Sequence, residues 1–332
     1  MTHYLVTGGA GYIGSHLVDL LLNRGQQVTV LDKGLYGFQA LEEFRFNPLF
    51  DLQVGDVRIR EDVEKALEGV TCVVHLAGLV GNPACSWNKE VAWSYNVGST
   101  RVLLDCLKST EINKFVFASS CSVYGFGSNC FTEKSNLNPV DYYAQTKMQS
   151  EQDIFEAGLE CSVAILRFST VFGVSKRMRF DLAVNGMTRD ALCQGVLHVY
   201  GGSQERPFIN CRDIGTAILG VVSHMSNNSS IDIYNIGNNA FNYTLKDIGE
   251  LITKTVHGAD IILDEKKVDK RSYKVSFDKI NNIGFEPSVS VTDGITAMIQ
   301  TIKNHLFSNP YSGIYSNYEM TKQLYLNGDD NE

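Results

Sequence analysis

Short apolar runs alternate with segments of helical spacing along much of this chain. The first run, at 4–6, breaks into the glycine-rich stretch 7–14, and a helical pattern follows over 15–23. Continuous apolar runs indicate strands buried on both faces, and the helical segments between them indicate crossover helices. Further strands are expected at 27–31, 51–57, 72–78, 114–120, 161–169 and 233–237, and further helices at 61–67, 96–107 and 142–157.

This alternation predicts an α/β fold with a doubly wound parallel sheet and right-handed crossovers. In such sheets the ligand binds beyond the carboxyl ends of the strands. The expected strand ends fall at Gly8, Asp32, Asp56, Gly78 and Ser120. Side chains at these positions are therefore the first candidates for a binding site.

The pattern changes after Gly173. A basic run at 175–179 precedes a helix expected at 181–194, and the chain returns to the sheet over 206–213 with a helix to 222. Beyond residue 237 we expect smaller helices with one short extended segment, 271–277. These insertions predict a smaller cap beside the sheet. The tyrosine-bearing tail at 308–332 can dock as an arm on the body or on a second subunit.

Composition excludes several classes of function. The net charge is −8 over 332 residues and the pI is about 5.4, so no nucleic-acid footprint is expected. No apolar stretch reaches 18 residues, and the first strand follows the N-terminus directly, so we expect neither a membrane span nor a signal peptide. The eight cysteines form no CxxC pair and the histidines are dispersed, so no metal is expected. We expect a cytoplasmic protein.

The glycine-rich stretch predicts a dinucleotide site. Gly8 permits a tight turn, Gly11 lets a pyrophosphate approach the backbone, and Gly14 lets the following helix pack closely, with its N-terminal amides facing the anion. Asp32 ends the next strand, 24 residues after Gly8, where a carboxylate can accept both hydroxyls of an adenine ribose. It would repel a 2′-phosphate and so favours NAD, although neighbouring Lys33 leaves NADP possible.

Three polar residues suggest alcohol oxidation. Tyr143 and Lys147 are four residues apart at the start of a predicted helix, so they share one face. An ammonium favours ionisation of a nearby phenol, which makes Tyr143 a candidate proton acceptor. Ser120, at a strand end, is placed to hold the same substrate hydroxyl. His75 and Cys121 are interpreted instead as buried packing residues.

Four motifs in order resemble the extended short-chain dehydrogenase/reductase family. They are TGGAGYIG at 7–14, HLAG at 75–78, SSCSVYG at 119–125 and YAQTK at 143–147. Within that family they are most similar to the NAD-dependent sugar-nucleotide epimerases and dehydratases, such as UDP-glucose 4-epimerases. The resemblance covers about residues 4–287. It implies a nucleoside-diphosphate sugar as substrate and NAD as cofactor.

The resemblance also implies roles for individual residues. Its catalytic triad is Ser120, Tyr143 and Lys147, and Asn96 matches a position that steadies the catalytic helix. The implied cofactor-binding residues are Gly8, Gly11, Tyr12, Ile13, Gly14, Asp32, Asp56, Val57, Ala77, Gly78, Asn96, Tyr143 and Lys147. The implied substrate-binding residues are Ser122, Arg206 and Arg271, of which the last two would grip the diphosphate. Arg179 and Asn185 are further candidates from the cap, whose segment 177–185 departs from the family's usual Asn-Leu-x-Pro pattern. At least one cation of the run 176–179 should also point inward, because guanidinium groups bind phosphate bidentately.

The same resemblance implies a division into domains and a dimer. A Rossmann domain for NAD is expected over 1–174 and 208–236. A substrate-binding α/β cap is expected over 175–207 and 237–307, followed by the tail at 308–332. A homodimer would form by packing the helices near 96–107 and 144–155 of two copies into a four-helix seam.

The predicted activity is NAD-dependent epimerisation of a nucleoside-diphosphate sugar, at C4, through a transient 4-keto sugar. Family dehydratases carry an Asp-Glu pair directly after the catalytic hydroxyl, whereas this chain has Cys121 and Ser122, which disfavours 4,6-dehydration. The main alternative is an NAD(P)H-dependent reductase of a 4-keto sugar nucleotide, or an epimerase/reductase. A non-catalytic NAD(P)-binding regulator is disfavoured because both Tyr143 and Lys147 are present.

Overall fold

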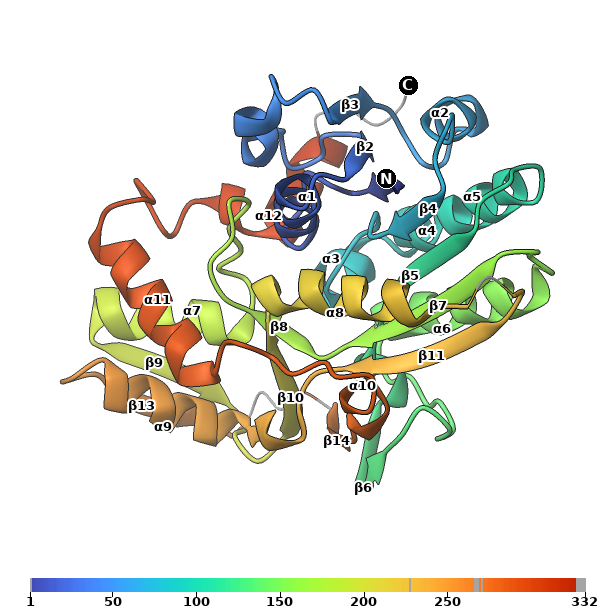
Figure 1. Cartoon of the computed structure of the whole chain (residues 1–332). Coiled ribbons are helices and arrows are strands. Elements are labelled where there is room, and N and C mark those ends of the chain that lie inside the picture. The colour runs from blue at the N-terminus through green and yellow to red at the C-terminus, as the bar shows by residue number, and fades with distance from the viewer. Residues whose placement is uncertain (1, 227, 266–268, 270, 327–332) are drawn as a thin grey trace.

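A parallel sheet of seven strands forms the centre of the molecule (Figure 1). The computed structural model describes residues 2–226, 228–265, 269 and 271–326. The strand order is β11-β7-β5-β4-β1-β2-β3, and every neighbouring pair is parallel. The strands are β1 (His3–Thr7), β2 (Gln27–Asp32), β3 (Phe50–Val54), β4 (Cys72–His75), β5 (Lys114–Ser120), β7 (Ser162–Phe168) and β11 (Ile231–Ile236). The predicted doubly wound sheet is thus confirmed.

Helices cover both faces of this sheet because successive strand residues point to opposite sides. Val6 belongs to the apolar cluster under α1 (Gly14–Asn23) and α8 (Cys211–His224). Leu5 belongs to the cluster under the helices of the opposite face. Those helices are α2 (Arg60–Ala66), α5 (Ser99–Leu107) and α6 (Tyr142–Glu156). Burial on both faces explains why the strands have continuous apolar sequences.

The sheet order reverses beside β1. From β1 the chain runs outward through β2 to β3, and it then returns to β4 on the other side of β1. Connections leave the sheet in opposite directions at this point, which opens a crevice at the carboxyl ends of the strands. The glycine-rich stretch follows β1 and therefore lies at this crevice.

A smaller unit packs beside the carboxyl edge of the sheet, at the lower left of Figure 1. Its apolar cluster includes residues of α7 (Ala183–Gln194), α9 (Leu245–Thr255) and α11 (Val291–Lys303). Its strands are β8 (Thr170–Phe172), β9 (Val196–Tyr200), β10 (Glu205–Asn210), β12 (Asn242–Thr244) and β13 (Asp260–Asp264). Two further strands, β6 (Phe126–Phe131) and β14 (Ser272–Val275), pair in parallel nearby.

One expectation for the second half of the chain was wrong. We expected a single extended segment after residue 237, but the structure has β12 and β13 in addition to β14. The strand β13 pairs with β9, which lies far away in the sequence. Such short strands depend on a partner supplied by the tertiary fold and carry little local signal.

The remaining helices are short. They are η1 (Gln39–Phe44), α3 (Asn82–Trp87), α4 (Lys89–Trp93), η2 (Ser94–Gly98), η3 (Cys121–Tyr124), η4 (Asn239–Phe241), α10 (Asp278–Asn281), η5 (Gly313–Tyr315) and α12 (Asn317–Leu326). Figure 1 shows the red C-terminal chain crossing from α11 back toward the blue N-terminal strands, where α12 lies. Residues 327–332, the end of the predicted tail, lie outside the described residues.

Among the described residues, none of the helices has the length and apolar character that crossing a lipid bilayer requires. The described part of the chain holds no group of three or more His, Cys, Asp or Glu side chains placed to bind a metal ion. All eight cysteines are free thiols.

Candidate active site

A cavity of about 820 Å³ lies at the carboxyl edge of the sheet and is walled on its far side by the cap. It has the size of a small-molecule site. Most of the residues singled out from the sequence line it. They are Gly8, Gly11, Tyr12, Ile13, Gly14, Asp32, Asp56, Val57, Ala77, Gly78, Ser120, Ser122, Tyr143, Lys147, Arg179, Arg206 and Arg271. Asn96 and Asn185 lie outside this lining.

Two glycines of the turn, Gly8 and Gly14, have no room for a side chain. A Cβ on Gly8 would lie 2.7 Å from the backbone nitrogen of Ala77, and one on Gly14 would lie 2.2 Å from the carbonyl oxygen of Gly8. Gly8 also has φ of +74°, a conformation that favours glycine. No side chain caps the first turn of α1. The backbone therefore forms a cradle beside a helix N-terminus, and this cradle suits a phosphate group.

Asp32 lies beside this cradle with both carboxylate oxygens held. One oxygen accepts a hydrogen bond from Ala10 N at 3.0 Å and the other from Gly34 N at 2.8 Å. Burial raises the pKa of Asp32, against the effect of these two hydrogen bonds. The carboxylate is fixed at the end of β2, where it can accept the hydroxyls of a ribose.

Lys33 contacts Asp56 and Tyr95. Its Nζ lies 3.4 Å from Asp56 Oδ2 and 3.3 Å from the Tyr95 hydroxyl. Asp56 also pairs with Arg58 at 2.6 Å. Burial acts to raise the pKa of Asp56, but the hydrogen bonds and charge of Arg58, with the charge of Lys33, outweigh it and lower the pKa. The positive charge of Lys33 is thus already shared with a carboxylate.

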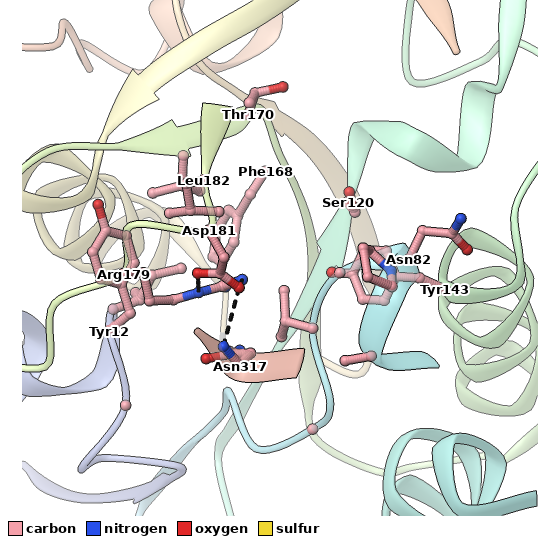
Figure 2. Close-up of a pocket in the computed structure, with 18 of the residues that line it drawn as sticks. Tyr12, Asn82, Ser120, Tyr143, Phe168, Thr170, Arg179, Asp181, Leu182 and Asn317 are labelled. Atoms are coloured by element: carbon pink, nitrogen blue, oxygen red, sulfur yellow. Dashed lines mark hydrogen bonds and ion pairs between the residues drawn. The ribbon is translucent and has the colours of Figure 1, made fainter. Parts of the chain in front are cut away.

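The three candidate catalytic side chains lie together at the ends of β5 and α6. Asp141 caps α6 by accepting a hydrogen bond from Ala144 N at 2.8 Å, which fixes where the helix begins. Tyr143 and Lys147 follow on one face of its first turns, and both are buried. The Ser120 oxygen accepts a hydrogen bond from the Ser122 hydroxyl at 2.8 Å. Figure 2 shows Ser120 beside Tyr143, whose ring points toward the cavity.

The protonation of this group is governed by burial. Burial, followed by the charge of Asp141 and the Cys85 thiol, raises the pKa of Tyr143, whereas Arg179 and the Ser120 hydroxyl act to lower it. Burial also lowers the pKa of Lys147 to about 8, and its Nζ donates to Ala118 O at 2.8 Å. The sequence predicts a readily ionised phenol, whereas burial in this structure favours its protonated form, and the role of Tyr143 as proton acceptor stays a prediction. In this structure the cost of burying a phenolate exceeds the effect of nearby positive charge.

Asn96 acts behind the cavity wall. It lies in the π-helical turn η2, and its Nδ2 donates to Leu79 O and to Thr146 Oγ1, each at 3.0 Å. Its Oδ1 accepts a hydrogen bond from Leu79 N at 2.7 Å. These bonds join the loop after β4 to the catalytic helix α6. These bonds agree with the predicted role of Asn96 in steadying the catalytic helix, and its contact with the cofactor stays a prediction.

Two arginines of the cap share one carboxylate. Asp269 Oδ2 lies 2.9 Å from Arg206 Nη2 and 2.6 Å from Arg271 Nη2. Burial acts to raise the pKa of Asp269, but Arg271 and Arg206 outweigh it and hold the pKa well below its usual range. Arg271 also lies 3.2 Å from Asp141, the cap of α6. This cluster therefore carries cations on the cavity wall and ties the cap to the catalytic helix.

The basic run divides between the cavity and the surface. Arg177 and Arg179 are buried on the cavity wall, whereas Lys176 pairs with Glu43 outside it. Arg179 is held by Asp181, with Nη2 and Oδ2 2.8 Å apart. Arg177 lies over the ring of Tyr36 at 4.2 Å, and burial, then the charge of Arg179, lowers its pKa to about 10. Arg177, Arg179 and Asp181 together bring two cations and one carboxylate to the cavity, a composition that favours an anionic ligand.

Asn185 is not a wall residue, contrary to expectation. Its Oδ1 accepts a hydrogen bond from Gly173 N at 2.9 Å, and its Nδ2 donates to Arg179 O at 2.8 Å and to the Tyr12 hydroxyl at 3.1 Å. It is fully buried. Its amide supports the backbone of Arg179 and the ring of Tyr12, two residues of the cavity wall, and its predicted contact with the substrate stays a prediction.

Several cavity residues were not found from the sequence. Asp181 and Asp269 each lie two positions from an arginine of the wall, a spacing that the sequence does show. Asn317 and Tyr318 line the cavity from the C-terminal chain. No local pattern marks them, because their position depends on how the end of the chain folds back.

Comparison with known proteins relates the chain to enzymes of sugar nucleotides. Residues 4–237 match the model of the NAD dependent epimerase/dehydratase family. A putative UDP-glucose 4-epimerase of Methanocaldococcus jannaschii is 27% identical over 310 residues, which are 91% of this chain and 98% of that protein. An uncharacterized protein of Sinorhizobium fredii is 31% identical over 259 residues, which are 75% of this chain but 59% of that protein.

Two solved structures are similar over nearly the whole chain. UDP-glucuronic acid 4-epimerase from Bacillus cereus, in complex with UDP-glucuronic acid and NAD, has a TM-score of 0.82 at 26% identity, covering 92% of this chain and all of that one. DesIV, a dTDP-glucose 4,6-dehydratase from Streptomyces venezuelae with NAD bound, has a TM-score of 0.80 at 26% identity, covering 92% and 98%.

Proposed function

This chain belongs to the NAD-dependent epimerase/dehydratase family, and from that premise we propose that it inverts C4 of a nucleoside-diphosphate sugar. One observation carries the proposal: Ser120, Tyr143 and Lys147 line the same cavity as the glycine turn and Asp32. A catalytic group and a dinucleotide cradle in one cavity suit an enzyme that oxidises and reduces a sugar carbon.

The cavity suits NAD as the cofactor. The side-chain-free turn at Gly8 and Gly14 would receive the pyrophosphate, and Asp32 would receive the adenine ribose. Asp32 would repel the extra phosphate of NADP, and Lys33 is already paired with Asp56, which supports NAD further. When bound, NAD would take a hydride from the sugar carbon and return it to the opposite face, so that no net oxidation occurs.

The chain's own residues would handle the proton and the phosphates. Tyr143 would accept the proton of the C4 hydroxyl and return it, while Ser120 positions that hydroxyl. The ammonium of Lys147 would stabilise the phenolate, whose formation burial opposes. Arg206 and Arg271 would bind the diphosphate through bidentate hydrogen bonds.

The residues after Ser120 favour epimerisation over dehydration. Cys121 is buried, its thiol donates to Arg167 O at 3.2 Å, and burial raises its pKa well above the usual range. Ser122 donates to Ser120. Neither side chain supplies the separate acid and base that water elimination needs. A 4-keto reductase would use the same triad, so the fate of the cofactor must distinguish it from the epimerase.

The decisive variant is Tyr143→Phe. We expect it to slow interconversion of the substrate by a factor of roughly 100 to 10,000, because it removes the proton acceptor. UDP-glucose, UDP-glucuronic acid and dTDP-glucose should each be incubated with the protein and the products identified by chromatography and NMR. A C4 epimer is the expected product, and denatured wild-type protein should release NAD.

The neighbouring Tyr142 provides a matched control. Its hydroxyl donates to Lys89 O at 3.1 Å, away from the cavity, so Tyr142→Phe should retain activity. An unchanged rate in Tyr143→Phe would refute the proposed mechanism. If the protein consumed stoichiometric NADPH on a 4-keto sugar and retained no NAD, the activity would be that of the reductase and not of the epimerase.

We also propose that two copies form a homodimer through α5 and α6. These helices lie side by side on one face of the sheet and are joined by Arg101 and Asp153, whose Nε and Oδ2 are 2.7 Å apart. Phe155 on α6 is 50% exposed. An interface formed by α5 and α6 would bury this ring, and aromatic residues are enriched in such interfaces. The predicted cytoplasmic location stays a prediction from the sequence.

A further inference from the structure

Arg177 differs from the other arginines of the cavity wall in having no carboxylate partner. The other wall arginines each pair with an aspartate: Arg179 with Asp181, Arg189 with Asp190, and both Arg206 and Arg271 with Asp269. Within the described residues, Arg177 forms no ion pair with an aspartate or a glutamate. It is nevertheless 94% buried, with 6% of its surface exposed. A buried charge of this kind needs a counter-charge.

The contacts of the Arg177 guanidinium are with neutral groups. Its Cζ lies 4.2 Å from the centre of the Tyr36 ring, and its Nη1 donates to Met178 O at 3.2 Å. Its Nη2 lies 3.6 Å from the sulfur of Met320 in α12. Burial, then the charge of Arg179, lowers its pKa to about 10, so the group still carries its charge at pH 7. These contacts use two of the five N–H donors and supply no negative charge.

One of the remaining donors, Nε of Arg177, is open to a ligand. It makes no hydrogen bond to a described residue, yet it is not sealed inside the protein. In the described part of the chain, the sealed side-chain N and O atoms without a partner belong to Asp141, Gln204, Asn281, Asn317 and Tyr325. Because Arg177 lines the cavity, a ligand held there can reach this donor.

The segment that carries Arg177 is fixed against the glycine turn. Ser175 Oγ donates to Tyr12 O at 2.8 Å, and it lies 3.3 Å from Ser15 Oγ in the first turn of α1. Figure 2 shows Tyr12 of this turn on the same side of the cavity as Arg179, the next arginine of the run. The basic run thus begins beside the N-terminus of α1, where the backbone forms the phosphate cradle.

The side chain of Arg177 reaches the loop that follows β2. Tyr36, whose ring lies under the guanidinium, is four residues beyond Asp32 and also lines the cavity. Arg177 is therefore near both elements that would hold the adenine half of a dinucleotide, the glycine turn and the end of β2. In such a ligand the adenine ribose is joined directly to the diphosphate.

We propose that Arg177 is a ligand-binding residue whose guanidinium binds a diphosphate group in this cavity. The inference rests on the proposed function, in which two ligands carry that group: NAD and the nucleoside-diphosphate sugar. Its place beside the glycine turn favours the diphosphate of NAD. The ligand would supply the negative charge that this arginine lacks, and guanidinium matches phosphate oxygens in geometry. The contact would also join the cap to the cofactor.

The test compares Arg177→Met, which keeps an apolar stem without the charge, with Arg177→Lys, which keeps the charge. Lys176→Met is the matched control, because it removes a neighbouring cation that pairs with Glu43 outside the cavity. Calorimetry measures binding of NAD, UDP-glucose and adenosine to the nucleotide-free full chain. Loss of a charged hydrogen bond should weaken NAD binding roughly 10- to 100-fold in Arg177→Met. Arg177→Lys should lose less, and Lys176→Met should bind like wild type.

The three probes identify which diphosphate Arg177 contacts. Weaker binding of NAD, with UDP-glucose and adenosine unchanged, assigns the contact to the cofactor. Weaker binding of UDP-glucose alone assigns it to the sugar nucleotide. Adenosine has no phosphate, so its affinity should be the same in wild type and in Arg177→Met.

Stability without ligand separates binding from packing. Arg177→Met removes a buried cation that has no carboxylate partner, so urea unfolding of the ligand-free protein should show no loss of stability. Unchanged affinity for NAD and for UDP-glucose would overturn the inference alone. A loss of stability together with weaker binding of all three probes would also overturn it, because the residue would then act through packing. Wild-type protein that binds neither NAD nor UDP-glucose would overturn the proposed function as well.

Discussion

Lys147 is buried, and burying its ammonium group lowers the stability of the fold. Its Nζ donates to Ala118 O and lies 4.9 Å from the centre of the Phe117 ring. These contacts do not replace its lost hydration, and burial lowers its pKa from 10.5 to about 8. A charge kept under such conditions is typical of a residue retained for chemistry and not for stability.

Lys147→Met should therefore stabilise the protein while removing activity. Below pH 8 both the folded and the unfolded chain hold the lysine proton, and the folded chain bears the full burial cost. Between about pH 8 and 10.5 only the unfolded chain holds it, so this cost is relieved as the pH rises. We expect Lys147→Met to be about 1–3 kcal/mol more stable at pH 7, with a smaller difference at pH 9.5.

Urea unfolding of both proteins at the two pH values checks this prediction. The lower end of the predicted gain in stability allows for the Ala118 carbonyl, which loses its hydrogen-bond donor in Lys147→Met. A variant that is less stable than wild type at pH 7 would show that the lysine stabilises the fold.

A buried ion pair fixes the catalytic helix α6 on the sheet. Arg167 at the end of β7 binds Glu151 of α6 through two hydrogen bonds, Nε to Oε1 at 3.0 Å and Nη2 to Oε2 at 2.6 Å. Glu151 also accepts a hydrogen bond from Ser119, next to Ser120. Arg167 donates further to the Tyr124 hydroxyl at 2.9 Å. This network sets the position of α6 relative to β5, and hence that of Lys147 relative to Ser120.

Arg167→Met should destabilise the protein by about 3–5 kcal/mol, because it leaves the Glu151 carboxylate buried without a partner. Adding Glu151→Gln should recover part of the loss, since the buried charge is then removed. Arg101→Ala breaks the partly exposed pair between Arg101 of α5 and Asp153 of α6 and should cost less than about 1 kcal/mol. The free energies come from urea unfolding. Equal costs for the two arginines would contradict the structural role given to Arg167.

At the scale of the whole molecule, the cavity is assembled from three parts of the chain. The sheet supplies the glycine turn and the triad, the cap supplies the arginines, and the start of α12 supplies Asn317 and Tyr318. Arg271 also ties the cap to α6 through Asp141. Because each part closes one wall, ligand binding should stabilise all three against one another.

Phe155→Glu tests the proposed homodimer. A charge at this half-exposed position on α6 should disrupt an interface formed by α5 and α6, while sparing the monomer fold. Light scattering after gel filtration should show wild type at twice the chain mass and the variant at the chain mass. Phe46→Glu, at an exposed site in the loop before β3, serves as the control. A monomeric wild type would refute the dimer.

The sequence by itself determined the parts that depend on neighbours along the chain. The sheet follows from apolar runs, the cradle from Gly8, Gly11 and Gly14, and the shared face of Tyr143 and Lys147 from helical spacing. These features are local, because the turn and the helix impose their geometry on residues a few positions apart. The family resemblance rests on the same local motifs.

Only the tertiary structure decided features that depend on residues far apart. Asn185, predicted to bind substrate, lies behind the cavity wall, where its amide bonds to Gly173, Arg179 and Tyr12. The strand β9 pairs with β13, and Asn317 lines the cavity, so both features join segments that are distant in the sequence. Burial, which raises the pKa of Tyr143 and lowers that of Lys147, likewise arises from packing. No stretch of sequence encodes it alone, since desolvation depends on everything packed around a group.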